Sequence, residues 1–139
     1  AGRLRIFPIG TILIAMYGQG KTRGKVAMLG IEAATNQACA AILPKKKIDP
    51  MFVFLSLGNR YDEMRELSNS GGQENLSQGL IKELSFAFPQ NVVEQQKIAS
   101  CLFSIDELIT TQSQKLATLK AHKKGLMQQL FPALDEATA

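Results

Sequence analysis

The sequence predicts a mixed α/β (α+β) globular domain followed by one long α-helix that forms a coiled coil. Residues 1–90 alternate short apolar runs with turn-forming segments, which is typical of strands and short helices in one domain. From Glu94 to Phe131 there is no proline and a single glycine, and apolar residues recur every seven positions. We therefore expect a domain over residues 1–90, a helix over 91–131 and a frayed tail over 132–139.

Composition places the chain among soluble folded proteins. Its 139 residues have a hydrophobic fraction of 45%, and the apolar run Ile12–Met16 is far shorter than the roughly 20 residues that cross a bilayer. No signal-peptide pattern is visible. Cys39 and Cys101 lie far apart in the sequence without nearby histidine ligands, so we expect reduced thiols in a cytoplasmic protein.

Three strands are predicted in the first part of the domain. Thr11–Met16, Val26–Leu29 and Ala38–Leu43 are rich in aliphatic or β-branched residues and are bounded by glycine or proline. A loop with three glycines and three cations, Gly18–Lys25, joins the first two strands. A polar connection, Glu32–Gln37, precedes the third.

Helices follow these strands. Asp49 and Pro50 match an N-cap and the first helical position, and the apolar face continues to Leu67 with an interruption expected near Gly58. Ser68–Gln73 is a turn-forming stretch. Further along, residues 76–82 predict a short helix, and residues 84–88 alternate in the manner of a strand.

The long helix is predicted to begin at Asn91, with Glu94 three residues later, and to end before Pro132. Roughly 38 residues at about 1.5 Å each give a rod about 57 Å long. Gln112 and Lys123 interrupt its two apolar rows, either as defects of the seam or as residues that fix its register and orientation, and the second interpretation is favoured. Because such a seam cannot be buried by one helix, we expect a partner helix in this chain or another. The apolar seam residues are Ile98, Leu102, Ile105, Ile109, Leu116, Leu119, Leu126 and Leu130.

Charge is unevenly distributed along the chain. Residues 1–60 hold nine Lys/Arg against two acidic residues, a balance of +7, whereas residues 61–139 have a balance of −3. A basic front half suggests contact with a polyanion. The alternative is a solvated surface that is basic by chance.

The glycine loop invites comparison with a nucleotide-binding P-loop. A P-loop requires glycine where this chain has Ala15, and a helix directly after Thr22, but an apolar strand is predicted there instead. The same loop suits DNA, because glycines allow close approach of the backbone while Lys21, Arg23 and Lys25 reach phosphates.

Polar side chains in the connections are candidates for base or backbone contacts, since Asn and Gln can pair with adenine in the major groove. For each of them a turn or cap role is the alternative, and Tyr17 could equally be buried. The candidates are Tyr17, Gln19, Thr22, Asn36, Gln37, Gln73 and Asn75.

Catalytic chemistry is not indicated. His122 is the single histidine and lies on the predicted long helix, without a carboxylate or cysteine at ligand spacing. The sequence also shows no pattern typical of a catalytic nucleophile paired with a general base. We expect no enzyme activity in this chain, no metal and no cofactor.

Together these segments resemble the type I restriction–modification specificity (S) subunits. The run Glu94–Ala99 and the ending Lys123–Pro132 resemble the conserved spacer helix of that family. Four upstream segments resemble the distal half of its target recognition domain. These segments are Gly10–Gly18, Gly24–Ala27, Ala34–Ala38 and Ser70–Ser77.

The resemblance implies a non-catalytic subunit that reads half of a bipartite DNA site. It would dock methylating (modification) subunits and restriction subunits, which carry out adenine methylation and cleavage. In the family, spacer helices pair antiparallel and set the distance between two recognition domains. This chain has one such helix and part of one domain, so a fragment or a half-subunit that dimerises is expected. The alternative function is a protein–protein coiled-coil adaptor without specific DNA binding.

Overall fold

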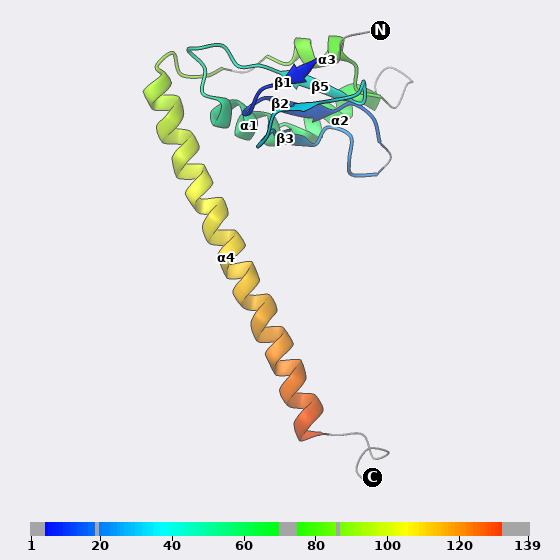
Figure 1. The fold of residues 1–139 in the computed structure, drawn as a ribbon, viewed down its shortest axis with the longest axis vertical. Helices are drawn as coiled ribbons and strands as arrows, with labels where there is room; N and C mark the ends of the chain where they lie inside the picture. The colour runs from blue at the N-terminus through cyan, green and yellow to red at the C-terminus, as the bar shows by residue number, and fades with distance from the viewer. Residues whose placement is uncertain (1–4, 19, 70–74, 86, 132–139) are drawn as a thin grey trace. The chain divides into compact units, whose positions relative to one another are not determined.

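The computed structural model describes residues 5–18, 20–69, 75–85 and 87–131, and divides the chain into two units, Ala1–Ala99 and Ser100–Ala139. In the first unit, the strands β2 (Ile12–Ala15), β3 (Val26–Met28) and β5 (Cys39–Ile42) form an antiparallel sheet in the order β3-β2-β5 (Figure 1). They coincide with the three predicted strands. A mixed α/β domain with a long C-terminal helix is thereby confirmed as the fold class.

A second sheet was not predicted. The strands β1 (Ile6–Phe7) and β4 (Ala33–Ala34) pair antiparallel, with Ile6 opposite Ala34 and Phe7 opposite Ala33. Strands of two residues carry no periodicity of their own, and β4 lies inside the segment that we expected to be a polar connection.

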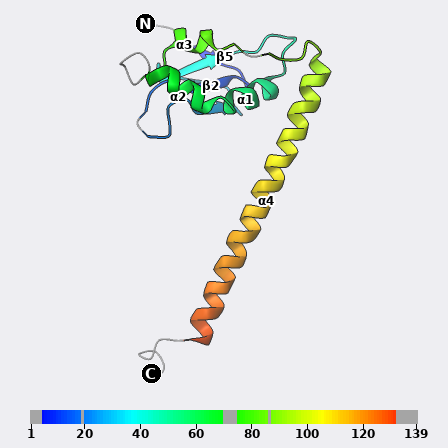
Figure 2. The same cartoon turned by 180° about the vertical axis from the view of Figure 1, so that it is seen from behind.

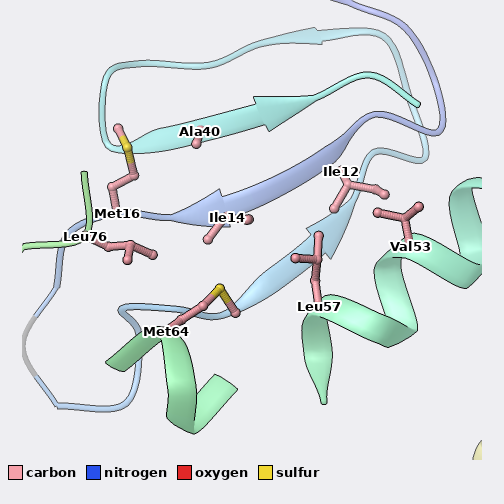
Figure 3. Packing of buried hydrophobic residues seen from close by; sticks show 8 residues of the cluster. All are labelled: Ile12, Ile14, Met16, Ala40, Val53, Leu57, Met64 and Leu76. Atoms are coloured by element: carbon pink, nitrogen blue, oxygen red, sulfur yellow. The ribbon is translucent and has the colours of Figure 1, made fainter. Parts of the chain in front are cut away.

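One face of the three-stranded sheet is covered by α1 (Pro50–Gly58) and α2 (Tyr61–Asn69), which lie in front of the strands in Figure 2. Alternation along β2 buries Ile12 and Ile14 toward the helices. Figure 3 shows the resulting core, in which side chains from β2, β5, α1, α2 and the segment before α3 meet. Its buried members are Ile12, Ile14, Met16, Ala40, Val53, Leu57, Met64 and Leu76.

The predicted helix starts are present as hydrogen-bonded caps. The Asp49 side chain accepts a hydrogen bond from Phe52 N at 2.8 Å, and α1 ends at Gly58, where the interruption was expected. The third helix, α3 (Gln78–Glu83), begins two residues later than expected and is capped by Ser77, which was not predicted. These local signals succeed because capping depends on a few neighbouring residues.

The predicted strand over residues 84–88 is wrong for the described part of that stretch, where residues 84, 85, 87 and 88 form no strand. Leu84 instead caps the C-terminus of α3. The carbonyl oxygen of Ser85 accepts a hydrogen bond from Arg60 Nη1 at 2.9 Å. This backbone group is thus bonded to a side chain and not to the backbone of a neighbouring strand. The alternation of apolar and polar residues was therefore not sufficient to predict a strand, because a strand also requires a neighbouring strand with which to form hydrogen bonds.

The helix α4 (Val92–Leu130) has 39 residues, and the Asn91 side chain accepts a hydrogen bond from Val93 N at 2.9 Å at its start. Two of its residues, Gln95 and Ala99, are buried within the first unit. No described helix is long and apolar enough to span a membrane.

Candidate nucleic-acid interface

One end of the three-stranded sheet gathers three connections. Because β2 runs antiparallel to both neighbours, its C-terminal end lies beside the starts of β3 and β5. Backbone hydrogen bonds join Ala15 N to Lys25 O at 2.9 Å and Met16 N to Ala38 O at 2.8 Å. Leu76 N donates to Met16 O at 2.9 Å, which brings the segment before α3 to the same end. Candidate residues from three stretches of sequence are thus placed together: the β2–β3 loop, the connection before β5 and the segment before α3.

The β2–β3 loop presents cations at this end. Gly18 has a φ of 124°, and a Cβ atom there would lie 3.0 Å from Thr22 Cβ, so the chain turns where a side chain would be strained. Lys21, Thr22 and Lys25 are exposed beyond this turn. The loop can therefore offer two ammonium groups and a hydroxyl to a polyanion.

Arg23 does not join them. The residue is only 6% exposed, so of the three predicted phosphate contacts the structure presents Lys21 and Lys25 to solvent but not Arg23. The sequence could not separate the three, because each is a cation in a glycine-rich loop. The difference arises from how the loop folds back on the domain.

The remaining predicted residues divide into three groups. Asn36 accepts a hydrogen bond from Ala38 N at 3.0 Å through its side-chain oxygen, which is a turn role, yet the residue is exposed. Gln37 and Asn75 are exposed as well, and Tyr17 is 43% exposed beside the glycine loop. Gln19 and Gln73 lie outside the described residues.

A groove of about 450 Å³ adjoins Asn36 and Gln37, between β1, β5 and α3. It is also lined by Arg5, Gln78 and Lys82, which sequence reasoning missed. The Arg5 guanidinium lies 5.0 Å from the centre of the Phe7 ring, in cation–π contact. Arg5 belongs to the basic front half, but only the fold brings it near residues 78 and 82.

The helix α4 carries a second exposed feature, its apolar seam. All eight predicted seam residues are exposed, from 37% for Ile98 to 70% for Leu130. Gln112 and Lys123 are exposed within the same two rows. An exposed apolar stripe of this length on a helix is typical of a protein-contact surface.

Metal chemistry has no visible basis in the part of the chain that the structure describes. No group of three His, Cys, Asp or Glu residues is placed there to hold an ion. Cys39 and Cys101 are free thiols.

Comparison with known proteins identifies the family. The family model of the type I restriction modification DNA specificity domain matches residues 3–121. The type I restriction enzyme MjaVIII specificity subunit of Methanocaldococcus jannaschii is 25% identical over 119 residues, covering 85% of this chain and 28% of that protein. The crystal structure of the type I restriction-modification system S subunit from M. genitalium matches with a TM-score of 0.68 at 20% identity, covering 96% of this chain and 35% of that one. The chain spans well under half of either protein, and it belongs to the family of type I restriction–modification DNA specificity domains.

Proposed function

We propose that this chain recognises a DNA sequence as the non-catalytic specificity component of a type I restriction–modification enzyme in the cytoplasm. The observation that carries the proposal is the gathering of exposed cations and amides at one end of the sheet in a member of a DNA specificity family. In this proposal the chain directs modification and restriction subunits to one half of a bipartite site.

The exposed residues have separate roles in the proposal. Lys21 and Lys25 contact phosphates, which supplies affinity without sequence information. The amides and hydroxyls near them contact base edges or sugars, which supplies discrimination. The proposed contacts of this second kind are Tyr17, Thr22, Asn36, Gln37 and Asn75, with Gln19 and Gln73 included on sequence grounds alone.

The seam of α4 pairs with a second spacer helix in the proposal, from the same subunit or from a second copy. In an antiparallel pair of copies, residues of one row face residues of the other. When Gln112 faces Lys123 of the second copy, the two polar interruptions are opposite each other. The same register makes three apolar pairs: Leu116 with Leu119, Ile109 with Leu126, and Ile105 with Leu130.

Alanine replacement of Lys21 and Lys25 tests the phosphate contacts. We expect the double variant to bind duplex DNA on the order of tenfold to a hundredfold more weakly, for all sequences alike. The slope of log affinity against log salt should also become shallower by about 1.8, since each lost phosphate contact removes about 0.9. Fluorescence anisotropy over a salt series measures both quantities.

The matched control replaces Lys45 and Lys46, which removes the same charge from the connection that follows the other end of β5. Both lysines are exposed, so the control tests whether net charge alone governs binding. Equal losses of affinity in the two double variants would contradict the proposed interface.

A further inference from the structure

Two side chains of α2 hold the tip of the β2–β3 loop. The Tyr61 hydroxyl donates a hydrogen bond to the carbonyl oxygen of Lys21 at 2.9 Å. Arg65 Nη1 donates to the carbonyl oxygen of Gly20 at 2.6 Å and to the Tyr61 hydroxyl at 3.2 Å. Two successive carbonyl groups of the loop are thus turned toward donors on one helix.

These two side chains also support each other. They lie four residues apart on α2, and the Arg65 guanidinium is 5.5 Å from the centre of the Tyr61 ring. The end of the loop, at Gly24, packs on the same turn of α2. A Cβ atom on Gly24 would lie 3.5 Å from Tyr61 O and 3.6 Å from Arg65 Cγ. The contact between α2 and the loop therefore involves both its tip and its end.

A loop of this composition requires such support. Gly18 and Gly20 have positive φ angles of 124° and 70°. Glycine adopts positive and negative φ angles about equally well, so these residues do not by themselves hold the loop in one conformation. Without fixed partners, the loop would lose conformational entropy each time it bound DNA, which would weaken binding. Hydrogen bonds to the Gly20 and Lys21 carbonyls remove part of that cost before binding.

We infer that Tyr61 and Arg65 are positioning residues for DNA recognition, which fix the backbone that carries Lys21 without themselves supplying the sequence contact. This inference rests on the proposed function and adds α2 to the recognition machinery. Holding both carbonyl groups toward α2 also keeps their partial negative charges away from an approaching phosphate.

Tyr61→Phe is the decisive variant, because it removes the hydroxyl and keeps the ring beside Arg65. We expect about fivefold weaker binding to a duplex selected by the wild type, which is the effect of losing about one net hydrogen bond. The salt slope should stay as in the wild type, because no phosphate contact is lost. In the free protein, trypsin should cleave faster after Lys21, as detected by mass spectrometry.

Arg65→Lys provides an independent second variant, since it keeps the charge but loses the planar guanidinium group. Its matched control is Arg60→Lys, because Arg60 donates to Glu63 and to Ser85 O. Weaker binding by Arg65→Lys than by Arg60→Lys, with an unchanged salt slope, would support the inference. Wild-type affinity and wild-type cleavage rates in Tyr61→Phe would overturn it.

The same experiment separates this inference from the function on which it rests. Failure of the wild type to bind any duplex would overturn the proposed function, and the positioning role with it. Binding by the wild type together with an unaffected Tyr61→Phe would overturn the positioning role alone. A salt slope that becomes shallower in Arg65→Gln, which removes the charge, would assign Arg65 a direct phosphate contact and would reject the positioning role for that residue.

Discussion

Replacing both Ile109 and Leu116 by glutamate is expected to separate paired copies of this chain into single chains. Both residues lie in one row of the seam on α4 and are more than half exposed, so the substitution should not disturb the fold of the first unit. In a pair of helices they are buried, and each would place an unpaired carboxylate against aliphatic side chains. Such a burial costs several kcal/mol per group, and in a symmetric pair every substitution occurs twice.

Light scattering measures the outcome directly. A single chain has a mass of 15.2 kDa, so the variant should give this mass under conditions where the wild type gives about twice as much. The control places glutamates at Gln114 and Ala121, which have the same spacing of seven residues but lie on the opposite face of the heptad. An unchanged mass for the seam variant, or an equal change in the control, would show that the seam does not mediate pairing.

The second large effect is expected at Gln95, at the start of α4. Its side chain is fully buried, accepts a hydrogen bond from Asp49 N at 2.9 Å and donates one to Pro89 O at 2.7 Å. It therefore joins the first turn of α4 to the N-cap of α1 within the first unit. Gln95→Leu preserves volume approximately but leaves a backbone N–H and a carbonyl without this partner.

We expect Gln95→Leu to lower the free energy of unfolding by about 1–3 kcal/mol, because two partly buried backbone groups lose their hydrogen bonds to this side chain. Urea denaturation followed by circular dichroism measures the change. The adjacent Gln96 is exposed, so Gln96→Leu introduces the same side chain at a solvated site and should change stability by less than about 0.5 kcal/mol. Similar stabilities of the two variants would mean that the Gln95 hydrogen bonds contribute little.

Much of the fold could be predicted because its signals are local. The strands β2, β3 and β5 are apolar runs bounded by glycine or proline, and the helix starts are capped by neighbouring residues. The long helix followed from its heptads, and the family assignment confirms the resemblance to specificity subunits. That assignment also places the chain with specificity subunits rather than with catalytic ones.

What could not be predicted depends on tertiary contacts. Pairing of β1 with β4 joins segments more than twenty residues apart, and residues 84–88 alternate without an edge to pair with. In the candidate interface, loop cations were found by composition, but burial of Arg23 and the hydrogen bonds from Tyr61 and Arg65 exist only in the folded chain. Local chemistry thus located the loop, whereas the fold decides which of its residues are exposed to solvent.

Selection from a pool of randomised DNA duplexes tests the central claim most directly. If the chain reads sequence, repeated capture on the wild-type protein should enrich one short motif. That motif should then bind on the order of 10³ times more tightly than a scrambled duplex at physiological salt. No enrichment, with equal affinities for enriched and scrambled duplexes across the salt series, would contradict sequence recognition and favour a coiled-coil adaptor whose basic surface binds DNA only by charge.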